Sequence, residues 1–207
     1  MLDIKQIDFS KMNGLVPVIV QDNHTLQVLM LGYMNEEALH QTLSSGLVTF
    51  FSRSKNRLWQ KGETSGDLLR VVEMFQDCDK DTILIMANPV GNTCHTGTVS
   101  CFTTQKTPPL SVIGALDKVI IERINYPQEG SYTNKLMAKG IKKIAQKVGE
   151  EGVEVVIAAL NETDDEYLGE MTDLLFHALI LLHAKNLDLS HFADKIAERH
   201  RNKINEV

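Results

Sequence analysis

The sequence predicts two domains of different class: an α+β domain rich in strands, followed by an all-α helical bundle. Before residue 103, short runs of β-branched and aromatic residues alternate with turn residues, a pattern typical of strands. Beyond residue 112, apolar residues recur at helical spacing. Two adjacent prolines and several hydroxyl residues between these parts indicate a linker. We therefore expect domains at 1–103 and 113–207, with a linker at 104–112.

In the first domain, one helix interrupts the predicted strands. Asn35 is a favourable N-cap, acidic Glu36 and Glu37 suit the first turn, and Gly46 suits the C-terminal stop. The predicted strands are 15–20, 26–31, 47–51, 69–75 and 82–87.

In the second domain, helical spacing predicts helices at 116–124, 133–148, 152–160, 165–184 and 190–202. Gly149 leaves open whether the second and third of these form one helix. Apolar residues are expected to bury one face of the helices at 152–160 and 165–184. These residues are Val153, Val155, Val156 and Ile157 on the first and Leu174, Leu175, Phe176 and Leu179 on the second.

Composition excludes several classes of protein. The net charge of -6 argues against general nucleic-acid binding. No apolar run reaches membrane-spanning length, and the first residues do not resemble a signal peptide. Three cysteines, an odd number, argue against a disulfide framework and for a reducing compartment. We expect a cytoplasmic protein.

Three carboxylates alternate along the chain at Asp77, Asp79 and Asp81. In an extended segment they would share one face, while Cys78 would point to the other. Three neighbouring carboxylates repel one another unless a cation lies among them, so the spacing suits magnesium. A solvated Asp-rich turn is the alternative.

All three cysteines lie in the same stretch. Cys78, Cys94 and Cys101 would supply three ligands with an open fourth position, the pattern of a catalytic zinc ion. His95 could act as a general base or orient a substrate. The alternative is that the cysteines are small buried apolar residues.

A segment rich in basic residues, hydroxyls and glycines surrounds the only tryptophan, at 52–66. Its backbone N–H groups, with Arg53 or Lys61, could hold a phosphate. Composition alone favours a solvated basic loop. The candidate substrate-binding residues are Arg53, Trp59, Lys61, Thr64 and Ser65.

The first domain resembles the phosphoribosyl-AMP cyclohydrolases of histidine biosynthesis. The motifs that carry this resemblance are GYMNEEAL (32–39), SRS (52–54), LWQKGETSG (58–66), DCDKD (77–81), CHTG (94–97) and SCF (100–102). The resemblance implies a homodimer, with zinc held by Cys78 of one chain and by Cys94 and Cys101 of the other. It also implies magnesium on Asp77, Asp79 and Asp81, and opening of the adenine ring of phosphoribosyl-AMP between N1 and C6 by zinc-activated water.

Two positions depart from that family. Gly32 stands where alanine is common, a change that we expect to be neutral. Thr98 stands where arginine is frequent, which puts any arginine contribution there in doubt.

Carboxylates also gather on the predicted helices of the second domain. Glu150 and Glu154 are four positions apart on a helix, and Glu151 and Glu154 are three positions apart, as are Glu170 and Asp173. Packing the two helices together would place these carboxylates around one or two magnesium ions, an arrangement suited to cleaving a phosphoanhydride. Solvated surface carboxylates are the alternative. His177, one turn after Asp173, could be a hydrogen-bond partner of the ligands or an ordinary packed histidine, and we expect the latter.

Basic residues precede these acids. Lys135 and Lys147 are candidates for binding substrate phosphates, whereas at least half of the lysines in this stretch are expected to be surface charges.

The second domain resembles the phosphoribosyl-ATP pyrophosphohydrolases, all-α enzymes similar to the MazG family. The matching residues are GSYT (130–133), Leu136, Gly140, KVGEE (147–151), Glu154, EMTDLL (170–175) and His177. The resemblance implies that Glu150, Glu151, Glu154, Glu170 and Asp173 hold Mg²⁺ while water cleaves the α–β phosphoanhydride. Gly152 replaces a usual alanine, which destabilises a helix by about 1 kcal/mol.

Together the two resemblances imply consecutive hydrolytic steps in one chain. The second domain would convert phosphoribosyl-ATP to phosphoribosyl-AMP and pyrophosphate, and the first would open the ring of that product. Four residues are candidates for catalysis: His95, Glu150, Glu151 and Glu154. One alternative is a nucleotide pyrophosphatase with a structural zinc dimerisation module, and another is a non-catalytic metal-binding protein.

Overall fold

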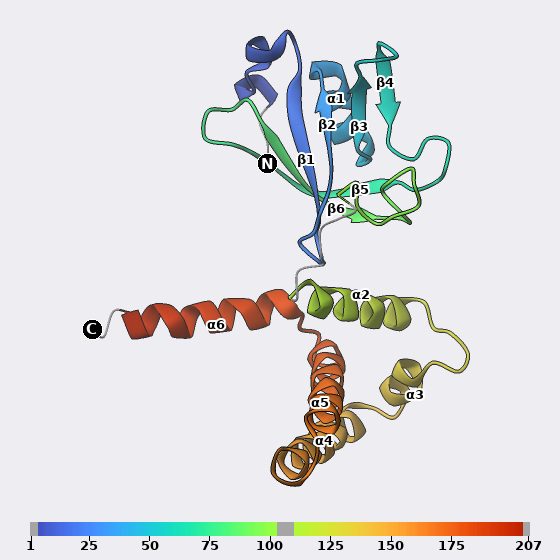
Figure 1. Cartoon of the computed structure of the whole chain (residues 1–207), viewed down its shortest axis with the longest axis vertical. Coiled ribbons are helices and arrows are strands. Elements are labelled where there is room, and N and C mark those ends of the chain that lie inside the picture. Colours follow the sequence, from blue (N-terminus) through green and yellow to red (C-terminus); the bar gives the residue numbers. More distant parts are fainter. Residues whose placement is uncertain (1–3, 103–109, 205–207) are drawn as a thin grey trace. The chain divides into compact units, whose positions relative to one another are not determined.

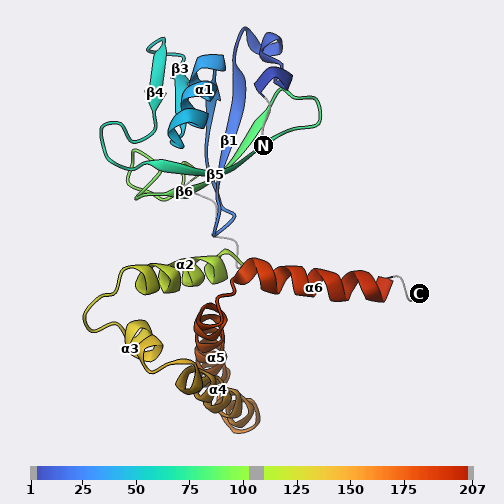
Figure 2. The same cartoon turned by 180° about the vertical axis from the view of Figure 1, so that it is seen from behind.

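The structure, a computed structural model, describes residues 4–102 and 110–204. It divides into two compact units, Met1–Gly114 and Ala115–Val207, and each is described by itself. The first unit is built on a mixed β-sheet and the second is all-helical (Figures 1 and 2), which confirms the predicted fold classes. No described helix combines the length and apolar character needed to cross a membrane.

The sheet of the first unit has the strand order β2-β1-β6-β5. Its strands are β1 (Val16–Asp22), β2 (Val28–Met34), β5 (Leu69–Gln76) and β6 (Ile83–Pro89). β1 pairs antiparallel with β2 and parallel with β6, and β5 and β6 form an antiparallel hairpin. Alternate residues of β1 and β6 are buried, as expected for strands with one face on the core.

The remaining elements of this unit pack against the sheet. Two 3-10 helices, η1 (Ile4–Gln6) and η2 (Phe9–Met12), precede β1. Helix α1 (Glu36–Ser45) begins after Asn35, whose side chain accepts a hydrogen bond from the Ala38 amide, and it ends at Gly46 with φ 70°. Both predicted caps are therefore confirmed.

One strand lies where the sequence favoured a loop. β3 (Thr49–Ser52) and β4 (Arg57–Gln60) form a two-stranded sheet in which Phe50 pairs with Trp59. Their rings stack with centroids 5.8 Å apart. The prediction of a solvated loop at 52–66 was wrong for Arg57–Gln60, because this aromatic pair anchors the second strand to the core.

The second unit consists of α2 (Ser111–Asn125), α3 (Tyr132–Ala138), α4 (Ile141–Asn161), α5 (Asp164–Ala184) and α6 (Leu189–Ile204). Residues 104–109 of the predicted linker lie outside the described residues, and its last two residues begin α2. Buried residues from α2 to α5 form its core: Ile120, Leu136, Ile144, Leu179 and Ile180.

The predicted helix 133–148 is wrong, because it is two helices. Gly140 has φ 79° and forms the N-cap of α4, a left-handed conformation that suits glycine and ends α3. Gly149, by contrast, lies inside α4, which continues without a break to Asn161.

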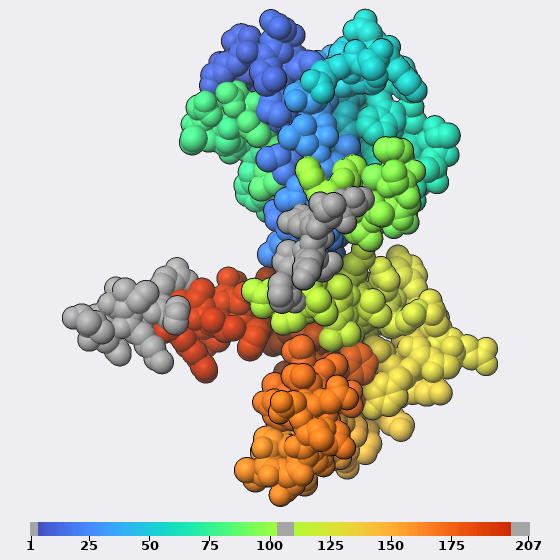
Figure 3. Space-filling view, viewed as in Figure 1, coloured from blue at the N-terminus to red at the C-terminus, as the bar shows by residue number. Residues whose placement is uncertain are grey.

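Apolar residues of α4 that were expected to be buried are exposed in the single chain. Val153 is 60%, Val156 58% and Ile157 47% exposed, and Leu175 on α5 is 36% exposed. In Figure 3, the C-terminal part of α4 and the start of α5 form the orange surface. Exposed apolar side chains gathered on neighbouring helices are typical of an interface with another chain.

Gly32 lies against the buried ring of Phe50, which gives a packing reason to test alanine at this position. A Cβ atom at this position of β2 would clash with two ring atoms of Phe50, which is only 1% exposed. We predict that Gly32→Ala lowers the free energy of unfolding by about 1–3 kcal/mol, because the buried ring must move. Chemical denaturation measures this.

Gly152→Ala is the matched control for that prediction. A Cβ at this helical position meets nothing within 4 Å, so the same change should raise stability by about 1 kcal/mol. Equal stability of Gly32→Ala and the unchanged protein would contradict the packing argument.

Candidate active sites

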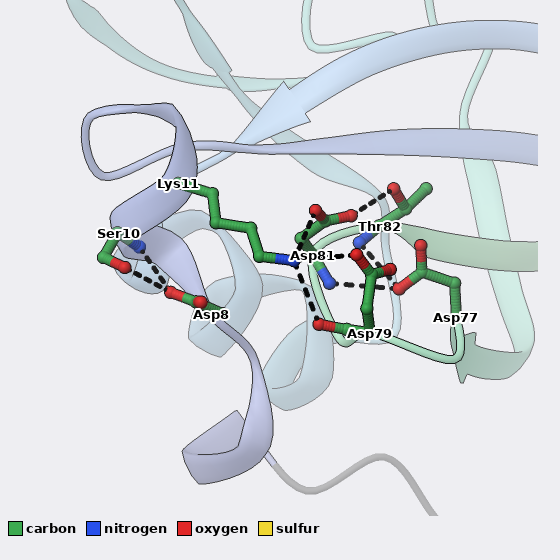
Figure 4. Close-up of polar contacts among 7 residues, drawn as sticks. All are labelled: Asp8, Ser10, Lys11, Asp77, Asp79, Asp81 and Thr82. Carbon is green, nitrogen blue, oxygen red and sulfur yellow. Dashed lines mark hydrogen bonds and ion pairs between the residues drawn. The ribbon is translucent and has the colours of Figure 1, made fainter.

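The three aspartates lie in the turn between β5 and β6 (Figure 4). The expected extended segment was wrong, since residues 77–81 turn and Lys80 has φ 65°. The turn nevertheless gathers the carboxylates, because Asp77, Asp79 and Asp81 each offer an oxygen within 4.8 Å of the others. Hard carboxylate oxygens so close together fit a magnesium ion.

Backbone groups fix the first of these carboxylates. Asp77 Oδ1 accepts hydrogen bonds from the amides of Asp81, at 3.0 Å, and Thr82, at 3.1 Å. Desolvation raises the pKa of Asp77, but the hydrogen bonds from Thr82 and Asp81 outweigh it and lower the pKa below its ordinary value. Asp77 is therefore held as a carboxylate.

A lysine that sequence reasoning missed completes this cluster. Lys11 of η2 places its Nζ 2.8 Å from Asp79 Oδ2 and 2.9 Å from Asp81 Oδ2. Its hydrogen bonds with Asp79 and then Asp81 raise the pKa of Lys11. It precedes its partners by 68 and 70 residues, so no local pattern could have indicated the contact.

Two of the three cysteines share a pocket with most of the predicted substrate-binding residues. The pocket has a volume of about 450 Å³ and is lined by Cys94 and Cys101. Its lining also includes the candidates Trp59, Lys61, Thr64, Ser65 and His95.

The chemistry of Cys94 suits a metal ligand. Its Sγ lies 3.0 Å from the Thr96 hydroxyl, and hydrogen bonds with the Thr96 side chain and backbone lower the pKa of the thiol to about 6. Thr98 stands where the resembled family often has arginine. Its hydroxyl also hydrogen-bonds the Cys94 thiol and lowers the pKa of that thiol. Burial raises the pKa of Cys101. A thiolate beside a second thiol is a donor set that fits zinc.

Lys61 is held in this pocket by the loop that follows β4. It is 6% exposed, and its Nζ donates a hydrogen bond of 2.8 Å to the Asp67 carbonyl. Burial lowers the pKa of Lys61, against the opposing effects of Asp67, Cys101 and Cys94. Gly62 permits the loop, since it has φ 83° and a Cβ there would lie 2.5 Å from the Asp67 carbonyl group.

Arg53 lies elsewhere. Its guanidinium stacks on Tyr33, 3.8 Å from the ring centroid, and lines a second pocket of about 670 Å³. Trp59 lines both pockets. Arg53 can therefore contact a ligand of the cysteine pocket only where that ligand extends past the tryptophan.

Cys78 is remote from the other two cysteines. It lies in the turn that joins β5 to β6, whereas Cys94 comes after the opposite end of β6. β6 runs for seven residues, which is about 20 Å of extended chain. Among the described residues, the three cysteines form no group whose ligand atoms lie within 4.8 Å of one another.

The helical unit brings together three of its five predicted ligands. Glu151 and Glu154 of α4 and Glu170 of α5 each offer an oxygen within 4.8 Å of the others. The pKa of Glu154 is raised because its carboxyl shares a hydrogen bond with Glu151, followed by desolvation and the nearby negative charges. This mutual repulsion would be relieved by a divalent cation.

A lysine holds the buried member of this group, and a histidine lies beside it. Glu151 is 4% exposed and accepts from Lys147 Nζ at 2.7 Å. His177 is more than a packed residue: its Nδ1 lies 2.8 Å from the Asp173 carbonyl and 3.5 Å from Glu151 Oε1. Its Nε2 lies 2.9 Å from the Tyr132 hydroxyl. Because the carbonyl can only accept, Nδ1 carries a proton and donates it to this carbonyl.

The other candidates of the helical unit lie outside this acidic group. Glu150 contacts Lys147 at 3.0 Å and Gln146 at 2.7 Å instead of the acidic group. The Asp173 side chain is exposed, and Lys135 is exposed on α3.

Both units match known families. Residues 30–103 match the phosphoribosyl-AMP cyclohydrolases, and residues 113–200 match the phosphoribosyl-ATP pyrophosphohydrolases. The "Histidine biosynthesis bifunctional protein HisIE" of Xanthomonas campestris pv. campestris is 53% identical over 94% of this chain and 93% of its own length. The chain belongs to the HisIE family of bifunctional histidine-biosynthesis proteins.

Two further relatives bear the same name. That of Bacteroides thetaiotaomicron is 51% identical over 94% of this chain and 96% of its own length. That of Vibrio cholerae serotype O1 is 50% identical over 95% of this chain and 94% of its own length. The bifunctional family member described here thus joins a cyclohydrolase domain to a pyrophosphohydrolase domain, and both are hydrolases.

Proposed function

We propose that the helical domain cleaves phosphoribosyl-ATP to phosphoribosyl-AMP and pyrophosphate, and that the β-rich domain opens the adenine ring of that product between N1 and C6. The observation that carries the proposal is the presence of two separate donor sets of different chemistry. Thiols line the pocket of one domain, and clustered carboxylates lie between two helices of the other.

For ring opening, Cys94 and Cys101 would hold zinc in the pocket that they line. Zinc, when bound, lowers the pKa of water to about 7 and so makes it a nucleophile at neutral pH. His95 lines the same pocket and is suited to move a proton to or from the purine ring. Lys61 and the hydroxyls of Thr64 and Ser65 would bind the substrate's polar groups, and Trp59 offers a face for the base.

The third zinc ligand would come from a second copy of the chain. Cys78 is separated from Cys94 by the length of β6, so a homodimer in which Cys78 reaches the partner's pocket completes a three-cysteine set. The exposed apolar side chains of α4 and α5 support association between chains. Free thiols that must stay reduced are compatible with a cytoplasmic location.

For pyrophosphate release, Glu151, Glu154 and Glu170 would hold magnesium, with Glu150 and Asp173 joining when the ion and substrate are present. Magnesium neutralises phosphate charge and lowers the pKa of its water ligands. A carboxylate such as Glu154, whose pKa is raised by Glu151, is suited to accept a proton from the attacking water. Lys147 keeps Glu151 in place and is close enough to the group to meet a phosphate. Lys135 would contact a phosphate further along the substrate.

Product analysis by mass spectrometry tests the whole proposal. The purified protein is incubated with phosphoribosyl-ATP, magnesium and zinc, and we expect pyrophosphate together with the ring-opened ribonucleotide. Accumulation of phosphoribosyl-AMP without ring opening would reduce the first domain to a structural zinc module. Absence of pyrophosphate would overturn the assignment of the helical site.

A further inference from the structure

The ammonium group of Lys11 lies beside two of the three aspartates that would hold a cation, Asp79 and Asp81. Figure 4 shows the side chain reaching from η2 into the cluster between Asp79 and Asp81. Besides the two carboxylates, its Nζ lies 3.4 Å from the Asp79 carbonyl. Lys11 therefore ties the N-terminal segment to the β5–β6 turn.

A divalent ion that bridges these aspartates needs oxygens that Lys11 already uses. Its ion pairs are with Oδ2 of Asp79 and Oδ2 of Asp81. Asp77 Oδ1 is engaged by two backbone amides. Magnesium binds oxygens at about 2.1 Å, and an ammonium at hydrogen-bond distance from the same oxygens would be close enough to repel it strongly.

We propose that Lys11 is a built-in counter-cation of the aspartate turn, which a divalent ion must displace in order to bind. Without the ion, Lys11 neutralises the clustered carboxylates and holds η2 against the turn. With the ion bound, that link is broken. The proposal rests on the magnesium site of the proposed function and adds the residue that sets the affinity of that site.

The chain offers a matched control in Lys80. This lysine lies in the same turn and carries the same charge. Its Nζ, however, donates a hydrogen bond of 3.0 Å to Oε1 of Gln6 on η1. Replacing it removes one positive charge near the aspartates without freeing a carboxylate oxygen. A difference in magnesium affinity between the Lys11 and Lys80 variants therefore reports direct competition for the carboxylate oxygens. It does not report the loss of one positive charge near the turn.

Isothermal titration of the full-length, zinc-loaded protein with magnesium chloride tests the proposal. The heat that Asp79→Asn removes is assigned to the turn, which separates it from binding at the helical glutamates. We expect Lys11→Met to bind the ion at the turn about five- to tenfold more tightly. Lys80→Met should change the affinity little.

Thermal unfolding supplies a second readout. In magnesium-free buffer, Lys11→Met should unfold about 2–4 °C below the unchanged protein, because the carboxylates then lack a counter-cation. Magnesium should remove that difference. Lys80→Met should not show this metal-dependent recovery.

Two results would overturn the inference, and they are distinguishable. Unchanged or weaker binding at the turn in Lys11→Met, with Asp79-dependent heat still present, would mean that Lys11 only supports the turn, and the magnesium site would stand. Absence of Asp79-dependent heat in both the unchanged protein and Lys11→Met would remove the magnesium site itself.

Discussion

Replacing Cys101 with alanine is expected to reduce ring opening of phosphoribosyl-AMP by about 1,000-fold or more, since the activating ion loses a ligand. Pyrophosphate release should continue at its usual rate, because the acidic group lies in the other unit. The measurement is a time course with phosphoribosyl-ATP, in which phosphoribosyl-AMP should accumulate in the variant.

Mixing two inactive variants provides the control for this loss. If each site takes Cys78 from one chain and Cys94 and Cys101 from the other, a heterodimer of Cys78→Ala and Cys101→Ala retains one complete site. Refolding an equal mixture should restore about a quarter of native ring opening. No restoration would contradict shared ligands, and loss of both reactions in a folded Cys101→Ala protein would contradict independent sites.

Glu154→Gln is expected to have the opposite effect. Pyrophosphate release from phosphoribosyl-ATP should fall by about 100-fold or more, because the amide keeps the shape of the side chain but can neither take up a proton nor attract the ion equally well. Ring opening should be unaffected when phosphoribosyl-AMP is supplied directly. Pyrophosphate release and ring opening are followed in parallel assays.

Glu162→Gln is a suitable control for that variant. Glu162 is an exposed carboxylate at the C-cap of the same helix, one residue beyond its last turn. The same chemical change there should leave both rates near native. Native pyrophosphate release in Glu154→Gln would exclude this residue as an essential ligand or base.

Local patterns were sufficient where local interactions decide the structure. The caps of α1 depend on Asn35 and Gly46 themselves and on amides a few residues away, so the sequence contains the whole signal. The strands of the main sheet were likewise recognised, with ends differing by a few residues. The spacing of Asp77, Asp79 and Asp81 also predicted that their carboxylates lie close together. The backbone that brings them together is a turn, however, and not the expected extended segment.

Contacts between separate elements explain what the patterns could not reveal. β4 forms because Trp59 stacks on Phe50 across the hairpin, and the same Phe50 makes Gly32 irreplaceable by alanine without rearrangement. The contacts of Lys11 and of His177 join residues far apart in sequence. Their partners are determined by tertiary packing, which a single sequence does not display.

The separation of Cys78 from Cys94 along β6 has a kinetic consequence under the proposed shared site. A single chain would carry a complete acidic group but an incomplete set of thiol ligands. Dilution below the dimer dissociation constant would therefore reduce ring opening before it reduces pyrophosphate release. The ratio of ring-opened product to phosphoribosyl-AMP would then depend on total protein concentration. The length of β6, which keeps Cys78 away from Cys94 in one chain, would thus make the product ratio depend on the amount of enzyme.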